Sequence, residues 1–173
     1  MVVVFGSINA DIVATVAVLP REGETRTASG YAVHAGGKGA NQALAARRAG
    51  ARVTLVGAVG RDGFAEIALG TLRDAGVDLS GVAISTRPTG IALIHVDAQG
   101  RNTITVVPGA NADARAAAVA DAALGPATTL LLQLEVPATE VIALAARAHD
   151  RGSRVILNLA PPAPVPDALL DAV

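Results

Sequence analysis

A cluster of glycines around the only lysine is the part of this sequence most able to do chemistry. Of the 14 basic side chains, 13 are arginine, and Lys38 is the exception. It lies in the run Gly36-Gly37-Lys38-Gly39, and Asn41 follows two residues later. Backbone N–H groups at a glycine-rich helix N-terminus suit an anion or a developing negative charge. The pattern alone also fits a flexible turn between a strand and a helix.

The same cluster does not match the standard nucleotide-binding motifs. A Walker loop requires glycine where Ala32 stands and serine or threonine in place of Gly39, and a dinucleotide fingerprint requires a third glycine near Gln42. The sequence therefore disfavours a dinucleotide-dependent oxidoreductase.

Two carboxylates and two amides follow the predicted strands. They are Asn9 and Asp11 after the first strand, Glu135 after the strand Thr128–Leu134, and Asn158 after the strand Arg154–Leu157. Because ligands of open α/β sheets bind beyond the carboxyl ends of the strands, we expect these side chains to meet Lys38 and Asn41 in one crevice. Carboxylates and amides make paired hydrogen bonds with adjacent hydroxyl groups, so the crevice is predicted to bind a polyol.

Each of these residues also has an ordinary structural interpretation. Asn9 and Asp11 could cap a turn, as Asn and Asp often do. Glu135 could be a carboxylate of a surface loop, and Asn158, which lies close to prolines, could be a turn residue. The sequence alone leaves both interpretations open.

The elements that must position these residues alternate between strand and helix. The predicted strands are Val2–Phe5, Arg52–Val56, Thr128–Leu134 and Arg154–Leu157, and the predicted helices are Ala40–Ala49, Phe64–Ala75, Asp113–Ala123 and Ala138–Asp150, with another beginning at Asp167. This alternation predicts an α/β fold with a Rossmann-like, doubly wound, mostly parallel sheet and helices on both faces.

Two segments, roughly residues 12–34 and 89–107, do not fit the alternation. Each contains two strand-like runs joined by a turn, and the run Asp97–Arg101 is a hairpin signal. We expect these segments to form a small antiparallel β-sheet lid that stands off the main domain.

Composition excludes several classes of function. A net charge of -1 and 2% aromatic residues give no surface for nucleic acid. There is no cysteine, which excludes disulfides and thiolate metal sites, and His34, His95 and His149 share no metal-ligand spacing. The first residues form an apolar strand without a basic leader, and no apolar run is long enough for a membrane span. We therefore expect a cytoplasmic protein.

Taken together, the motifs resemble those of the ribokinase-type (PfkB) carbohydrate kinase family. The matching stretches follow the family's order along essentially the whole chain: Gly6-Ser7-Ile8-Asn9-Ala10-Asp11, Gly23-Glu24-Thr25, Gly36-Gly37-Lys38-Gly39-Ala40-Asn41-Gln42-Ala43, residues 57–64, Thr89-Gly90-Ile91-Ala92, Gly109-Ala110-Asn111-Ala112, Gln133-Leu134-Glu135 and Asn158-Leu159-Ala160-Pro161. The Gly-Gly-Lys-Gly-Ala-Asn-Gln element is highly specific. Ala65 stands where the family usually has glycine, and Leu159 where it usually has proline.

The resemblance implies a set of sugar-binding residues. They are Asn9, Ala10, Asp11, Gly36, Gly37, Lys38, Gly39, Ala40, Asn41 and Glu135. In the family, the Asn and Asp of the first motif hold sugar hydroxyls, the glycine pair is the hinge of the lid, and the lysine also approaches the transferred phosphate.

The resemblance also implies a reaction, its cofactors and a partner. The reaction is transfer of the γ-phosphate of ATP, with Mg²⁺ and a monovalent cation (K⁺), to the 5-hydroxyl of D-ribose. The partner is a second copy of the chain, in a homodimer formed through the β lid.

The family's catalytic aspartate has no counterpart in these 173 residues. It lies in a late Gly-Ala-Gly-Asp-like motif, near the ATP-binding loops and the cation site, and the sequence contains none of these parts. We therefore expect the catalytic aspartate to lie beyond Val173, so that no catalytic residue other than the phosphate-contacting Lys38 is present. Residues 1–173 are expected to be the N-terminal portion of a ribokinase-like domain, without the C-terminal ATP-binding portion, and to be inactive alone.

Two alternatives remain open at this point. The chain could come from another sugar or nucleoside kinase of the same family, such as a fructokinase. It could also be a non-catalytic module for sugar binding or dimerisation.

Overall fold

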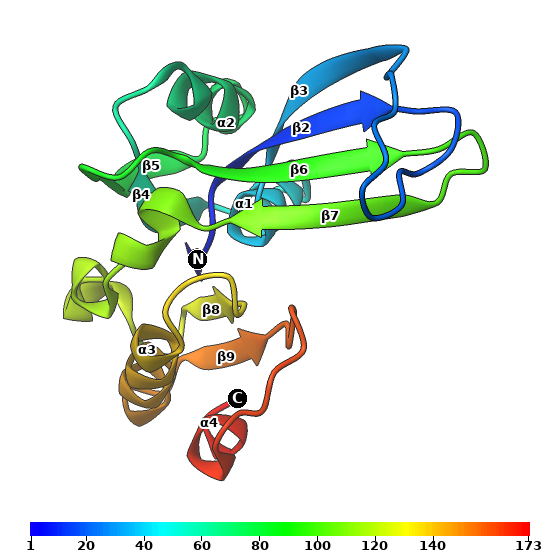
Figure 1. Ribbon diagram of the computed structural model, residues 1–173. Coiled ribbons are helices and arrows are strands. Elements are labelled where there is room, and N and C mark those ends of the chain that lie inside the picture. Colours follow the sequence, from blue (N-terminus) through cyan, green and yellow to red (C-terminus); the bar gives the residue numbers. More distant parts are fainter.

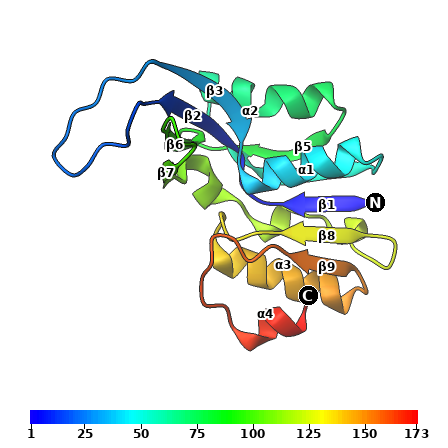
Figure 2. The ribbon, with the colours of Figure 1, turned by 90° about the vertical axis from the view of Figure 1, so that its right-hand side faces the viewer.

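The main body of the protein is a five-stranded parallel sheet. A computed structural model describes residues 1–173 (Figure 1). The strand order is β5 (Asp78–Ile84), β4 (Val53–Val59), β1 (Val2–Phe5), β8 (Thr129–Leu132) and β9 (Arg154–Leu157), and every neighbouring pair is parallel. Figure 2 shows β1, β8 and β9 side by side. The predicted parallel sheet is confirmed.

Helices cover both faces of this sheet. They are α1 (Lys38–Arg48), α2 (Gly63–Asp74), α3 (Ala138–Asp150) and the short α4 (Asp167–Asp171). Successive side chains of a strand point to opposite faces. Val4 of β1 accordingly packs in one core with α1 and α2, while Val3 and Phe5 pack in a second core with α3 and α4. The doubly wound arrangement is therefore confirmed. None of these helices combines the length and the apolar character needed to cross a membrane.

A second, four-stranded sheet projects from the main body (Figure 1). Its order is β3 (Gly30–Gly36), β2 (Asn9–Thr15), β6 (Gly90–Val96) and β7 (Asn102–Val107). The predicted antiparallel arrangement is wrong in one pair, because β2 and β6 are parallel. Both strands leave the main sheet in the same direction, β2 after β1 and β6 after β5, so the small sheet is mixed.

The predicted helix Asp113–Ala123 is also wrong. The segment instead forms three 3-10 turns, over Gly109–Asp113, Ala116–Ala118 and Asp121–Ala123. Beside the hydrogen bonds within the 3-10 turns, side chains of α3 bond to the backbone of this segment. Glu140 accepts from the N–H of Ala116 at 2.8 Å, and Arg147 donates to the carbonyl oxygen of Ala116 at 2.9 Å. The segment is thereby fixed against the core without being a helix.

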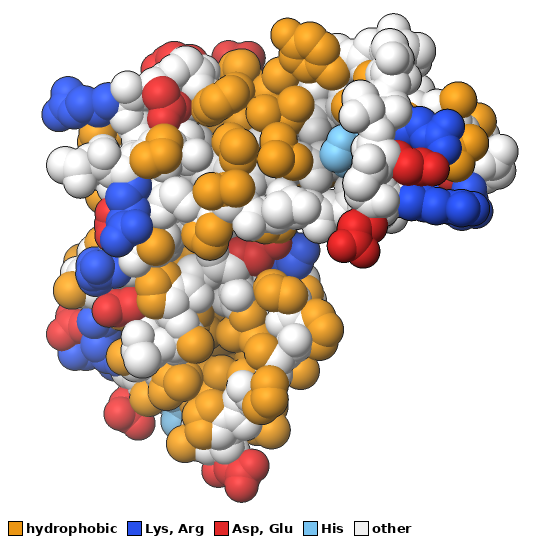
Figure 3. Space-filling view, in the orientation of Figure 1, with side chains coloured by type: hydrophobic (Ala, Val, Ile, Leu, Met, Phe, Trp, Pro, Cys, Tyr) orange, Lys and Arg blue, Asp and Glu red, His pale blue; other side chains and the backbone are white.

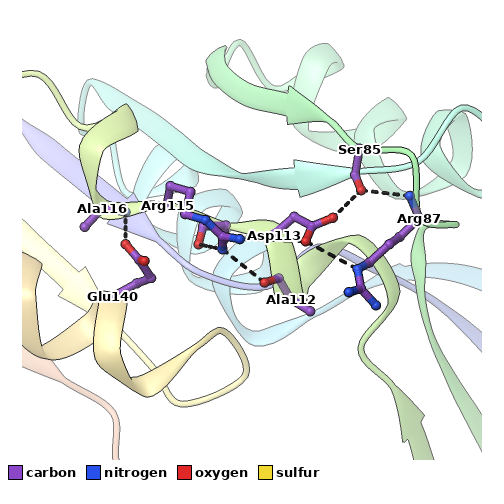
Figure 4. Close-up of polar contacts among 8 residues, drawn as sticks. Ser85, Arg87, Ala112, Asp113, Arg115, Ala116 and Glu140 are labelled. Atoms are coloured by element: carbon purple, nitrogen blue, oxygen red, sulfur yellow. Dashed lines mark hydrogen bonds and ion pairs between the residues drawn. The ribbon is translucent and has the colours of Figure 1, made fainter.

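The first of these turns is also tied to the loop that precedes β6. Asp113 accepts from the Ser85 hydroxyl at 2.6 Å and from Nε of Arg87 at 3.3 Å (Figure 4). Figure 4 shows these contacts on one side of the segment and the Glu140 contact on the other. The segment therefore connects the base of the small sheet rigidly to α3.

Candidate functional site

A cavity of about 130 Å³ lies where the small sheet meets the N-terminus of α1. Five polar residues line it: Asn9, Asp11, Lys38, Asn41 and Glu135. Its apolar wall comes from β6 and β7 and consists of Ala92, Ile94, Ile104 and Val106. The structure thus brings together five side chains that are far apart in the sequence. The volume is below the roughly 300–1,000 Å³ of drug-sized ligand sites, so the cavity suits a small polar molecule.

Asp11 reaches the cavity from β2. Its Oδ1 atom is buried and has no hydrogen-bond partner in the protein. Burial raises the pKa of Asp11, and the negative charge of Glu135 raises it further, while His34 and Lys38 act in the opposite direction. A Cβ atom on Gly36 would lie 2.2 Å from the Asp11 carboxyl group, so only glycine leaves room for it. A buried carboxylate oxygen without a donor in the protein can accept a hydrogen bond from a bound ligand or from water.

Glu135 connects three donors from two residues of separate segments, Ser7 and Lys38. Its Oε2 atom accepts from the Ser7 hydroxyl at 2.6 Å and from the Lys38 N–H at 3.1 Å. Its Oε1 atom forms an ion pair with Nζ of Lys38 at 3.1 Å. Burial by itself would raise the pKa of Glu135, but the bonds from Ser7 and Lys38 together lower it. Glu135 is therefore an ionised carboxylate that holds the lysine at the cavity.

The backbone amides at the start of α1 are all satisfied within the chain. The Lys38 N–H donates to Glu135, and the Gly39 N–H donates to the Ser7 hydroxyl at 3.3 Å. The N–H groups of Ala40 and Asn41 donate to the carbonyl oxygens of Ser7 and Gly37 at 2.9 Å. The sequence left open whether these N–H groups bind an anion; in the structure the Lys38 N–H donates to the protein's own carboxylate, Glu135. The ammonium group of Lys38, whose side chain is 37% exposed, is the cation at the cavity.

Gly39 is required by the close approach of α1 to the segment after β1. A Cβ atom there would lie 2.6 Å from the backbone carbon of Gly6 and 2.7 Å from the backbone nitrogen of Ser7. Gly39→Ala is expected to lower the free energy of unfolding by about 2 kcal/mol, as overpacking does. Urea unfolding measures this. Gly70→Ala is the matched control: it lies in α2 with open space around it and is expected to stabilise by roughly 0.5–1 kcal/mol. Equal effects of the two substitutions would contradict the prediction.

Several predicted site residues do not line the cavity. Ala10, Gly36, Gly39 and Ala40 are buried behind its wall, and among the predicted residues without a polar side chain only Gly37 lines it. Asn158 is exposed at the end of β9 and is not part of the lining. Strand β8 lies between β9 and β1, so the end of β9 lies away from the crevice between β1 and the small sheet.

The last residue of the sequence also lies outside the site. Val173 follows α4 and is 48% exposed, and it lines neither this cavity nor the larger one described below. The cavity contains Asp11 and Glu135 as its carboxylates, and neither belongs to a Gly-Ala-Gly-Asp-like motif. That a catalytic aspartate lies beyond Val173 therefore stays a prediction.

Two residues of the site had no predicted role. Ser7 is fully buried and donates to Glu135, and Asn111 is 1% exposed and donates to Oδ1 of Asn9 at 2.7 Å. The available signals were the motifs Gly6-Ser7-Ile8-Asn9 and Gly109-Ala110-Asn111. Both side chains bond to other residues, so neither has the pattern of a ligand contact.

A larger cavity of about 580 Å³ adjoins the first one. The two share Lys38, Glu135, Ile104 and Val106. The rest of its lining is mostly apolar: Pro108, Ala112, Leu134, Val136, Pro137 and Pro161. The Lys38–Glu135 pair therefore lies between a small polar cavity and a larger apolar one.

This arrangement defines an α/β protein with a polar cavity between a doubly wound sheet and a smaller, projecting sheet. The sequence matches the pfkB family of carbohydrate kinases over residues 1–173, and the chain belongs to this family.

Its relatives include several ribokinases. It is 36% identical to the ribokinase of Haemophilus influenzae over 98% of this chain and 56% of that protein. A structure of Arabidopsis thaliana ribokinase complexed with ribose and ATP matches with a TM-score of 0.84 and 34% identity, over 99% of this chain and 57% of the other. Thermotoga maritima ribokinase matches with a TM-score of 0.89 and 32% identity, over 99% and 57%. The chain thus spans little more than half the length of these relatives.

Proposed function

We propose that these 173 residues form the sugar-binding part of a ribokinase-type kinase, which transfers the γ-phosphate of ATP to the 5-hydroxyl of D-ribose. The observation that carries the proposal is the buried, unpartnered Oδ1 atom of Asp11 in a small polar cavity beside the Lys38–Glu135 pair. The relatives named ribokinase, and the solved complex of one of them with ribose and ATP, support it.

Each polar side chain has a role in this proposal. Asp11 accepts hydrogen bonds from sugar hydroxyls, because its free oxygen needs donors. Asn9 and Asn41 bind further hydroxyls, and the isoleucine and valine side chains of β6 and β7 cover the apolar face of the ring. Lys38 lies on the border of the two cavities, so its ammonium group can neutralise negative charge on the phosphate during transfer.

The residues present fit some of the predicted cofactors better than others. The larger cavity beside Lys38 has room for a phosphate group, which supports a phosphate donor such as ATP. No group of three His, Cys, Asp or Glu side chains could hold a metal ion, and Glu135 is already paired with Lys38. These residues alone form no complete site for Mg²⁺, which is usually held by one or two carboxylates together with substrate phosphates, and the roles derived above involve neither Mg²⁺ nor K⁺.

We also propose that the small sheet acts as a lid and joins two copies into a homodimer. Large hydrophobic side chains of this sheet are exposed, including Tyr31, Leu93 and Ile104. Figure 3 shows hydrophobic side chains gathered over the small sheet. Such a surface is typical of an interaction site.

The cytoplasmic location remains a prediction.

Isothermal titration of this chain with D-ribose, without ATP, tests the sugar-binding role. Saturable binding of ribose is expected, with weaker binding of D-fructose and adenosine. Tighter binding of fructose or adenosine would favour another sugar or nucleoside kinase of the family. Binding of none of them would contradict the proposal. With ribose and MgATP, the 173 residues alone are expected to release no ADP above background, because they contain no Gly-Ala-Gly-Asp-like motif.

A further inference from the structure

The buried side chain of Asn111 joins the turn after β7 to the start of β2. Its Oδ1 atom accepts a hydrogen bond from the backbone N–H of Ile8 at 2.9 Å. Its Nδ2 atom donates to Oδ1 of Asn9 at 2.7 Å and to the carbonyl oxygen of Ile8 at 3.3 Å. One carboxamide therefore holds both residues at the point where the chain passes from the main sheet into the small sheet.

These bonds fix the orientation of two carboxamides. A backbone N–H group can only donate, so the Asn111 atom that faces Ile8 must be the oxygen. The other end of Asn111 is then an NH₂ group, and the Asn9 atom that it meets must be an acceptor. The Nδ2 group of Asn9 is left without an acceptor in the protein, and Asn9 lines the small cavity.

The surroundings keep this arrangement rigid. A Cβ atom on Gly90 would lie 2.3 Å from Nδ2 of Asn111 and 2.4 Å from Oδ1 of Asn9, so glycine leaves the space for the bond between them. The turn that carries Asn111 is held by the contacts of Asp113 with Ser85 and Arg87 (Figure 4). Side chains fixed in this way already have the conformation that binds the ligand, so binding does not have to order them.

We propose that Asn111 is a positioning residue that makes Asn9 a hydrogen-bond donor toward the ligand. The inference rests on the proposed function, in which the ligand is a sugar. The carboxylate of Asp11 in the same cavity can only accept. A sugar hydroxyl can donate to Asp11 while it accepts from Asn9. A cavity that offers both an acceptor and a donor therefore recognises a hydroxyl group through its hydrogen and through its oxygen.

Asn111→Asp tests the proposal. The new carboxylate still accepts from the N–H of Ile8 but, when ionised, cannot donate to Asn9. The Asn9 amide is then expected to rotate, donate to that carboxylate and turn its oxygen toward the cavity. Ribose affinity, measured by isothermal titration, is expected to fall about 30-fold. Asn102→Asp is the matched control, because Asn102 is exposed on β7, and it is expected to leave the affinity unchanged.

A double-mutant cycle separates positioning from a general structural role. Asn9→Ala removes the donor that Asn111 orients. In that background, Asn111→Asp is expected to change ribose affinity by less than about twofold. Losses that multiply would overturn the proposal, as would an Asn111→Asp variant that folds and binds ribose like the wild type.

Hydrogen exchange of the side-chain amides decides the orientation in the wild-type protein without any substitution or ligand. By NMR, the NH₂ hydrogens of Asn111 are expected to exchange slowly with water and those of Asn9 quickly. The reverse order would overturn the proposal, even if Asn111→Asp does not fold. A wild-type chain that binds no ribose would contradict the proposed function, while this exchange result would still decide the orientation.

Discussion

Asp11→Asn is expected to weaken ribose binding by about 100-fold or more and to raise the melting temperature of the chain at neutral pH. The loss of binding follows from the free Oδ1 atom, which is buried and accepts from no donor in the protein. A carboxylate offers two acceptor oxygens to the hydroxyls of a sugar, whereas an amide replaces one of them with a donor. A ligand hydroxyl would then face an NH₂ group where it needs an acceptor.

The gain in stability follows from the direction of the pKa shift. Burial and, second, the charge of Glu135 raise the pKa of Asp11 in the folded protein. The folded chain therefore holds this proton more tightly than the unfolded chain, and ionisation destabilises the fold. The destabilisation is absent below the ordinary aspartate pKa, grows as the pH rises through the raised pKa, and is complete above it. Asparagine removes it at neutral pH.

Differential scanning fluorimetry from acid to neutral pH measures this effect. After solvent screening of a half-buried group is allowed for, the rise in Tm is expected to be about 2 °C at pH 7 and to disappear in acid. Asp74→Asn is the control, because Asp74 is exposed at the end of α2 and lies outside the cavity. A lower Tm for Asp11→Asn, or unchanged ribose affinity, would show that Asp11 is a structural residue.

The elements that the sequence predicted well are those with local signals. The helix Ala138–Asp150 follows Pro137 and has a regular apolar face, and it forms with the predicted bounds. Strand β5 was not predicted, because it is an edge strand with an alternating, mostly exposed pattern and a glycine within it. The Ala-rich segment after Gly109 has a strong helix propensity, but it forms 3-10 turns whose backbone at Ala116 is bonded to side chains of α3. Tertiary contacts of this kind cannot be predicted from local sequence.

In the site, too, residues with a local signal were predicted, and residues defined by contacts with distant segments were not. The rule for strand ends identified Asn9, Asp11 and Glu135, because it depends only on chain direction and sheet topology. It failed for Asn158, because the sequence did not reveal that β8 lies between β9 and β1. Ser7 and Asn111 bond to partners more than 100 positions away, and no local pattern distinguishes such residues from ordinary turn residues.

Glu135→Gln is expected to lower both stability and ribose affinity, in contrast to Asp11→Asn. The carboxylate accepts from Ser7 and from the backbone and side chain of Lys38, and its side chain is 12% exposed. Glutamine retains one acceptor oxygen and turns an NH₂ group toward one of these donors. The expected loss is about 2 kcal/mol, the value of hydrogen bonds to a charged group, which corresponds to a fall in Tm of roughly 4–8 °C. Ribose affinity is expected to fall about 100-fold, because Lys38 is no longer held in place.

The pH dependence of the loss in Tm shows whether Glu135→Gln acts by removing the charge of Glu135 or by changing the shape of its side chain. The bonds from Ser7 and Lys38 outweigh burial and lower the pKa of Glu135, so the ionised form stabilises the fold. This contribution is present above the ordinary glutamate pKa and is lost as the pH falls through the lowered one. The difference in Tm between wild type and Glu135→Gln should therefore narrow in acid. Glu66→Gln is the control: its ion pair with Arg73 is exposed, so a change below about 1 kcal/mol is expected. If Glu135→Gln behaved like Glu66→Gln, the carboxylate would not be what holds Lys38 at the cavity.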